Sequence, residues 1–325
     1  MIVSQELGGL TARDLRGSVV SVGVFDGVHL GHQAILRGNV LRSRELDAVP
    51  TVVTFRQHPK SLLLGRAPRT LTSLEHRLEL FRRAGIEHTL VLTFDDELRR
   101  IPARDFAFDV LVGALGARKL VLGFDSKFGK DRQGTPEYLQ SLGLDVEIAP
   151  KVKVAGRAVS STAIREAIEL GDLEQAARML GRRVAVYGAV VAGSALGREL
   201  GFPTANLDLH HELRPPTGVY AGFARRVRYA ERTATERSEA AAADEDRLPA
   251  VANVGFRPTL GGPRPEAPLV EVHLIDFAGE LYGESIELEF AAHLRDERKF
   301  PDLETLKAQI AADVENARRV LAALG

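Results

Sequence analysis

The chain carries near its start the segment Val22-Gly23-Val24-Phe25-Asp26-Gly27-Val28-His29-Leu30-Gly31-His32. An apolar run leads into it, a glycine turn crosses it and a helical pattern follows, which is typical of a strand, a turn and a helix. His29 and His32 are three residues apart, so they share one face of that helix. Because the first turn of a helix presents backbone N–H groups and the positive end of its dipole, the segment predicts a cradle for phosphate groups.

Two other interpretations of the histidine pair stay open on the residues alone. The pair could lie on a solvated helix start that binds nothing, or it could supply two ligands to zinc. The sequence offers no HExxH pattern, no cysteine and no obvious third ligand for that metal.

The first half of the chain alternates short apolar segments with amphipathic ones. Strands are predicted at Val19–Phe25, Val49–Phe55, Leu90–Phe94, Leu120–Gly123 and Val146–Ile148, and helices at His32–Arg44, Arg77–Ala84 and Phe106–Leu115. Such alternation predicts an α/β domain with a parallel, doubly wound sheet. Sheets of this kind bind ligands at the carboxyl ends of their strands, where the turn at Gly27 falls.

The second half has a different texture, because glycine and proline separate strand-like runs and no long helix interrupts them. These runs are Val184–Val191, Gly218–Val227, Leu248–Val254, Leu269–Phe277 and Ser285–Phe290. They predict an antiparallel sheet or small closed barrel, with a terminal helix over Leu303–Leu324. We place the boundary at Gly181-Arg182-Arg183, giving domains of 1–182 and 183–325.

Bulk composition narrows the functional classes. The chain has 325 residues, 45% of them hydrophobic and 27% charged, a net charge of −1 and no cysteine. The net charge near zero does not indicate binding to nucleic acid or to a membrane surface. The absence of cysteine excludes thiol catalysis and disulfides. The first residues lack the pattern of a signal peptide and no apolar run approaches membrane-spanning length, so we expect a soluble cytoplasmic protein. The oligomeric state is left open.

Three further segments of the first half follow predicted strands. Thr54-Phe55-Arg56-Gln57-His58-Pro59 places a histidine and an arginine after the second strand, and Gly123–Lys130 is a glycine-bounded basic loop. Each alone could equally be a solvated loop. Ser160-Ser161-Thr162 opens a helix running to about Leu170, and three hydroxyls followed by Arg165 exceed what one cap requires. Together with His29 and His32, these segments predict a convergent anion site.

Two segments of the second half carry candidate chemistry. In Pro203-Thr204-Ala205-Asn206, an extended backbone directs Thr204 and Asn206 to one side, where their oxygens suit Mg²⁺, although a simple turn would explain them too. Val270-Glu271-Val272-His273-Leu274 alternates as a strand should. Glu271 could take a proton from an alcohol that attacks ATP, or it could lie on a merely solvated face.

At this point the residues closely resemble the bifunctional prokaryotic riboflavin kinase/FMN adenylyltransferase family, also called FAD synthetases. The resemblance covers nearly the whole chain, and its motifs occur in the family's order. They are FDGVHLGH, with the HxGH signature of nucleotidyl transfer, then TFxxHP, SSTAIR, GRELGFPTAN, GVYA, NVGFRPT, VEVHLIDF and LYG.

The resemblance implies two reactions with ATP as co-substrate and Mg²⁺ as cofactor. A C-terminal six-stranded barrel would phosphorylate riboflavin to FMN, and an N-terminal Rossmann-like nucleotidyltransferase domain would adenylylate FMN to FAD. The implied catalytic residues are Glu271 as general base, His29 and His32. The implied metal ligands are Thr204 and Asn206. Implied contacts to ATP are Gly23, Phe25, Asp26, Gly27, His29, His32, Ser161, Thr162, Arg165, Gly193, Gly197 and Arg198. Implied contacts to the flavin are His58, Asp125, Phe128, Asn206 and Arg295.

Departures from the family keep alternatives open. Proline is frequent in the family where Gln57 stands, and an aromatic residue where Ser126 stands. Both lie near the expected adenylylation site, so a chain in which only the kinase turns over is one alternative. A catalytically silent flavin sensor is another. The segment Ala230–Asp246 is rich in Ala, Glu and Arg and predicts a solvated loop.

Overall fold

The computed structural model of the chain describes residues 1–5, 17–57, 69–191, 196–209, 212–227, 247–256 and 268–324. Its contacts divide the chain into two compact units. The first comprises Met1–Ile164 and Arg178–Gly181, and the second Arg165–Ala177 and Arg182–Gly325. The domain boundary at residue 182 stays a prediction, and each unit is described by itself.

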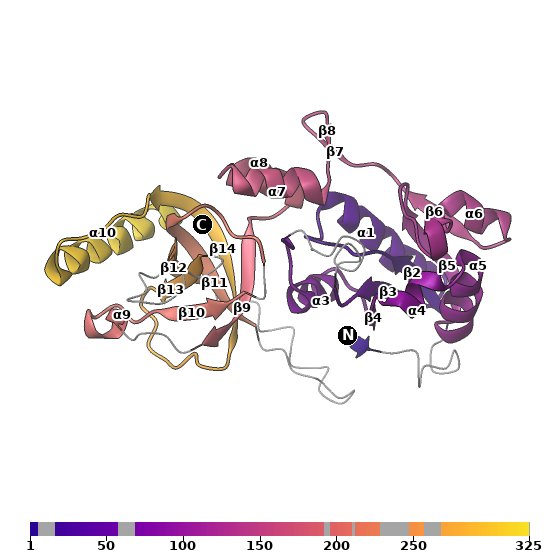
Figure 1. Cartoon of the computed structure of the whole chain (residues 1–325), viewed down its shortest axis with the longest axis horizontal. Coiled ribbons are helices and arrows are strands. Elements are labelled where there is room, and N and C mark those ends of the chain that lie inside the picture. Colours follow the sequence, from indigo (N-terminus) through magenta and orange to yellow (C-terminus); the bar gives the residue numbers. More distant parts are fainter. Residues whose placement is uncertain are drawn as a thin grey trace. The chain divides into compact units, whose positions relative to one another are not determined.

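The first unit is built on a six-stranded parallel sheet in the order β1-β4-β3-β2-β5-β6 (Figure 1). Its strands are β1 Ile2–Ser4, β2 Ser18–Val22, β3 Val49–Phe55, β4 His88–Leu92, β5 Ala117–Gly123 and β6 Val146–Ala149. The predicted parallel sheet is thereby confirmed. The chain leaves β2 toward β3 and β4 and later returns to β5 on the other side of β2. Strand order therefore reverses between β2 and β5, the position at which such sheets bind ligands.

Helices cover both faces of this sheet. The helices of this unit are α1 Leu30–Glu45, α3 Leu74–Arg83, α4 Asp96–Arg100, α5 Ala103–Asp105, the π-helix η1 Phe106–Ala114, the 3₁₀ turn η2 Lys130–Arg132 and α6 Pro136–Ser141, followed by a hairpin of β7 Lys153–Val154 and β8 Arg157–Ala158. Two more helices, α7 Ser161–Glu169 and α8 Leu173–Leu180, have residues in both units. The expected helix over Phe106–Leu115 is present in π form. There Leu115 N–H donates to the carbonyl of Val110, five residues back.

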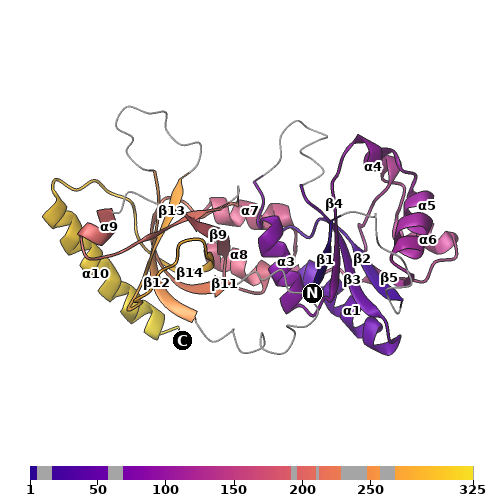
Figure 2. The ribbon, with the colours of Figure 1, turned by 90° about the horizontal axis from the view of Figure 1, so that it is seen from below.

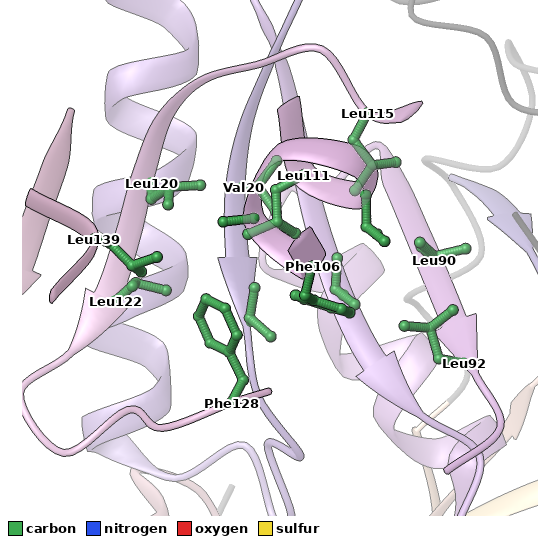
Figure 3. Packing of buried hydrophobic residues seen from close by; sticks show 14 of the residues in the cluster. Val20, Leu90, Leu92, Phe106, Leu111, Leu115, Leu120, Leu122, Phe128 and Leu139 are labelled. Atoms are coloured by element: carbon green, nitrogen blue, oxygen red, sulfur yellow. The ribbon is translucent and has the colours of Figure 1, made fainter. Parts of the chain in front are cut away.

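Successive side chains of each strand point to opposite faces of the sheet, and they form two separate hydrophobic cores. Val53 and Leu90 face a cluster with Phe106 and Leu111 of the η1 segment, which Figure 3 shows from close by. Val52 and Val91, their immediate neighbours, face the opposite cluster under α1 and α3. Each core strand is thus buried on both sides, which explains its continuous apolar sequence.

The second unit is a closed antiparallel barrel in the order β10-β13-β12-β11-β14-β9 (Figure 2). Its strands are β9 Ala185–Val191, β10 Ala205–Asp208, β11 Gly218–Val227, β12 Arg247–Gly255, β13 Leu269–Leu274 and β14 Ser285–Arg295, with helices α9 Leu196–Glu199 and α10 Leu303–Ala322. The expected six-stranded barrel and terminal helix are confirmed. Val219 and Val251 on the outer face of the barrel pack against Val314 and Ala317 of α10.

Element bounds agree most closely with the sequence where a strand is strongly apolar. β3 and β11 occupy the residues expected, whereas β14 continues five residues beyond Phe290 and ends at Arg295. β1 and α8 were not expected. The segment Ala230–Asp246 lies outside the described residues. Within the described ranges, none of the helices combines the length and the apolarity that crossing a bilayer requires.

Candidate active sites

The glycine turn after β2 places two histidines at the start of α1. Gly27 has a φ of 83°, and a Cβ there would lie 2.7 Å from Leu71 Cδ1, so the turn requires glycine. Val28 follows with a φ of 38°, a strained conformation for a β-branched residue and one that occurs mainly at functional sites. His29 then caps α1, since its Nδ1 accepts the backbone N–H of His32 at 3.3 Å. The two imidazole rings stack with centroids 3.6 Å apart.

The side chains of Phe25 and Asp26 have protein partners, and the expected contact of these two residues with ATP stays a prediction. Phe25 is 3% exposed, and its ring packs edge-on against His32 and against Phe81 of α3. The Asp26 carboxylate is also buried, and its Oδ1 accepts N–H bonds from Leu71 and Thr72 at 2.8 and 3.1 Å. Both side chains therefore face protein and hold the turn in place. Their burial is visible in the structure and not in the sequence.

The three hydroxyls at the start of α7 have three different environments. Ser160 Oγ accepts the N–H of Ala163 and caps the helix, and Ser161 Oγ donates to the carbonyl of Asp26 at 2.9 Å. Thr162 is exposed on the first turn. Arg165 lies three residues later, on the same face of α7 as Thr162. Ser161 thus links this helix to the glycine turn, while Thr162 stays accessible to a ligand.

Sequence reasoning missed Arg77, which lies on α3 and is 4% exposed. Its Nη1 donates to the carbonyl of Val24 at 2.5 Å and its Nη2 to that of Phe55 at 3.0 Å. One guanidinium thus joins the ends of β2 and β3 at the carboxyl edge of the sheet. The only sequence signal was a basic residue among apolar positions of an expected helix.

The remaining expected residues of this unit lie in loops at the same edge. Asp125 is exposed and Ser126 half-buried in the loop after β5, and Gln57 is exposed after β3. Phe128 is 8% exposed and packs in the hydrophobic core, with its ring centroid 5.2 Å from that of Phe106 (Figure 3), and its expected contact with the flavin stays a prediction. His58 lies outside the described residues.

In the second unit, the strand register brings candidate side chains together on the outer face of the barrel. Asn206 of β10 pairs directly with Glu271 of β13, and Glu271 pairs with Asn253 of β12. Asn253 is opposite Val219 of β11, which is opposite Arg295 of β14. Directly opposed residues direct their side chains to the same face, so these five form one row across five strands. We call them the outer row.

The outer row contains Asn253, which sequence reasoning missed. Its signal was the NVGFRPT motif, whose first residue it is. The outer row also contains Arg295, whose Nε and Nη2 donate to the carboxylate of Asp313 on α10 at 2.8 to 3.0 Å. Asp313 is 5% exposed, so this ion pair anchors α10 to β14. The expected contact of Arg295 with the flavin stays a prediction.

Thr204 and Asn206, the expected metal ligands, are two residues apart at the start of β10. Thr204 is exposed just before β10, and Asn206 is 8% exposed beside Glu271. A Cβ on Gly197 would lie 2.5 Å from the carbonyl oxygen of Phe202 and 3.0 Å from Thr204 Oγ1, so only glycine allows α9 to approach this closely. Hydroxyl and amide oxygens are hard donors that fit Mg²⁺ with its retained waters.

Of two further residues expected to contact ATP, Arg198 and Gly193, the structure describes the first. Arg198 follows Gly197 on α9, and Gly193 lies outside the described residues. Over the part of the chain that the structure describes, no three His, Asp or Glu side chains group as a metal site. A magnesium site of Thr204, Asn206 and ATP oxygens requires no such group.

Comparisons with known proteins agree with both units. The family model for FAD synthetase matches residues 11–163, and the model for riboflavin kinase matches residues 180–321. The chain is similar to a bifunctional riboflavin kinase/FMN adenylyltransferase of Haemophilus influenzae, with 37% identity covering 94% of this chain and 95% of the relative. It is similar to those of Escherichia coli K12, with 36% identity over 93% and 92%, and of Bacillus subtilis, with 34% over 93% and 92%.

A solved structure shares the whole fold. A protein from Streptococcus pneumoniae, described as a macrolide-efflux protein, has 30% identity and a TM-score of 0.76, covering 98% of this chain and 99% of that one. Two matched family models and relatives above 30% identity over nearly the full length show the family. The chain belongs to the bifunctional riboflavin kinase/FMN adenylyltransferases and is an enzyme of FAD biosynthesis.

Proposed function

We propose that residues 183–325 phosphorylate riboflavin to FMN and that residues 1–182 then adenylylate FMN to FAD. The observation that carries this division is the direct pairing of Asn206 with Glu271, which puts an oxygen donor beside a carboxylate on the barrel. The stacked histidines over the start of α1 supply a separate anion site in the first unit.

In the kinase step, the Glu271 carboxylate takes the proton of the riboflavin 5′-hydroxyl as its oxygen attacks the γ-phosphorus of ATP. The γ-phosphoryl–oxygen bond to ADP breaks, FMN and ADP leave, and Glu271 returns the proton to solvent. Thr204 and Asn206 would hold Mg²⁺ on the ATP phosphates, where the ion neutralises charge. Gly197 keeps the approach to Thr204 open.

In the adenylyl step, a phosphate oxygen of FMN attacks the α-phosphorus of ATP, and pyrophosphate leaves. The attacking oxygen is already an anion, so no general base is required. His29, His32 and Thr162 align the phosphates, and the histidines help to neutralise their charge, which is the main task in such transfers. The cytoplasmic location expected from the sequence belongs to this proposal, as do Mg²⁺ and the restriction to small-molecule partners.

A time course of the full chain with riboflavin, ATP and Mg²⁺, with flavins resolved by liquid chromatography, tests the proposal. FMN should appear first and FAD follow. Glu271→Gln should lower FMN formation by about 10²- to 10⁴-fold while supplied FMN is still adenylylated. His32→Ala should do the converse.

Other outcomes separate the alternatives. FMN without FAD would mean that the kinase alone is active, and would direct attention to Gln57 and Ser126. Flavin binding without product would favour a sensor. Loss of both activities in either variant, with the fold retained, would contradict the assignment of two independent sites.

A further inference from the structure

His273 contacts the segment that carries Thr204. It lies two residues beyond Glu271 on β13 and shares the outer face of that strand. Its Nδ1 is 2.8 Å from the carbonyl oxygen of Pro203, and its ring meets that of Phe202 edge-on with centroids 5.6 Å apart. A carbonyl oxygen only accepts, so Nδ1 of His273 carries a proton and donates it.

The hydrogen bond from His273 to Pro203 lies just beyond the last backbone pairing between β10 and β13. Pairing between β10 and β13 runs through Leu207–Val270 and Asn206–Glu271 and stops at Ala205–Val272. Pro203 has no N–H group to donate to a continued ladder. The imidazole of His273 therefore holds, through a side chain, a backbone segment that strand pairing does not hold.

The Thr204 side chain is exposed, so the position of its hydroxyl is set by the backbone segment that carries it. Gly197 borders Thr204 from one side, and the bond from His273 fixes the peptide immediately before it. Movement of Pro203 would shift the Thr204 hydroxyl relative to Asn206, which the ladder keeps opposite Glu271.

We propose that His273 is a positioning residue of the kinase site, which fixes Pro203 so that Thr204 and Asn206 can bind the magnesium–ATP complex together. The proposal rests on the proposed function of Thr204 and Asn206. His273 itself does not touch the reacting atoms.

Two variants of the full chain separate this role from mere packing. His273→Phe keeps an aromatic ring against Phe202 and removes the donor, whereas His273→Asn places an amide N–H near the position of Nδ1. We expect His273→Phe to raise the KM of the kinase for MgATP by roughly tenfold, the scale of one lost hydrogen bond, with kcat and the KM for riboflavin little changed. His273→Asn should restore the KM to within about threefold of the parent value.

Two controls keep this test independent of the kinase assay. Adenylylation of supplied FMN by the same preparations should be unchanged. In the parent chain, ¹⁵N NMR of the imidazole should report the Nδ1–H tautomer for neutral His273. If His273→Phe fails to fold, His273→Gln replaces it, because its longer amide reaches the Nε2 position instead.

The proposal is overturned if His273→Asn is as impaired as His273→Phe, if neither changes the KM for MgATP, if kcat alone falls, or if NMR shows an Nε2–H tautomer. A parent chain that makes no FMN would refute the proposed function. The NMR result would still decide whether His273 holds Pro203.

Discussion

The imidazole rings of His29 and His32 lie with centroids 3.6 Å apart and planes within 16° of parallel, while His29 Nδ1 accepts the backbone N–H of His32. Because Nδ1 is the acceptor, the proton of neutral His29 is on Nε2. One side chain thus caps α1 and directs its remaining N–H away from the cap, where an anion can accept it. Capping and ligand binding can be separated by substitution.

His29→Ala should lower the free energy of unfolding by about 1 kcal/mol, because the cap is lost. His29→Asn should stay within about 0.5 kcal/mol of the parent chain, because asparagine is a good N-cap. Both should reduce FMN adenylylation by about 10²-fold or more, because neither offers an imidazole to the phosphates. Urea unfolding and an adenylylation assay measure the two effects. If His29→Asn kept its activity, the cap alone would explain the histidine.

Arg77→Met should destabilise the chain by roughly 1–3 kcal/mol, since it removes the guanidinium that donates to the carbonyls of both Val24 and Phe55, although Thr54 Oγ1 still donates to that of Val24. FMN adenylylation should fall because the ends of β2 and β3 are released, while riboflavin phosphorylation is retained. Arg77→Lys, which keeps the charge but not the fork of donors, should be intermediate. Equal loss of both activities would show a global effect instead.

The Arg295–Asp313 pair should contribute more to stability than the more exposed Arg318–Asp276 pair of α10. Asp313→Ala should lower the free energy of unfolding by about 2–4 kcal/mol, because it leaves the Arg295 guanidinium without its carboxylate partner. The side chains of Arg295 and Asp313 are 21% and 7% exposed. Asp276→Ala, which breaks the Arg318–Asp276 pair at 41% and 69% exposure, should cost less than about 1 kcal/mol. Urea unfolding compares them, and equal costs would refute the anchoring role of Arg295.

His88 should make stability depend on pH. It is 1% exposed, with Nε2 3.1 Å from Ser4 Oγ, and burial holds the pKa of His88 below its usual 6.5. Below that pH the unfolded chain takes up a proton that the folded chain resists. The unfolding free energy should therefore fall as pH drops below 6.5, by at most about 1.4 kcal/mol per pH unit, and level off below the folded pKa.

The measurement is urea unfolding of the parent chain and of His88→Gln between about pH 5 and 8. The variant lacks the titrating ring, so the difference between the two curves isolates His88 from the other histidines. This difference should be flat above pH 6.5 and change below it. Parallel curves throughout would contradict the prediction.

The sequence predicted the secondary structure best where a buried element is also a continuous apolar run. β3 and β11 were located to the residue because their runs are apolar and sharply bounded. β1 was missed because three residues carry too little periodicity, and its position is decided by pairing with β4. β14 was ended early because its last residues are only partly buried, although they still pair with β11.

Site residues that are neighbours in sequence were predictable, and those joined by register were not. His29 and His32 follow from a helix start, as does Ser160 from the start of α7. No local pattern states that Asn253 stands opposite Glu271. Nor does the sequence reveal that the side chains of Phe25, Asp26 and Phe128 are buried, because each stands in a motif beside exposed residues.

The outer row constrains which changes of length the barrel can accept. Along β13, Glu271 and His273 alternate with Val270, Val272 and Leu274, which are 0%, 1% and 5% exposed. A single inserted or deleted residue within this strand would turn a carboxylate toward the barrel interior and a valine toward the outer face. The core and the proposed kinase site would be lost together, so we expect insertions and deletions in this half of the chain to be confined to the loops.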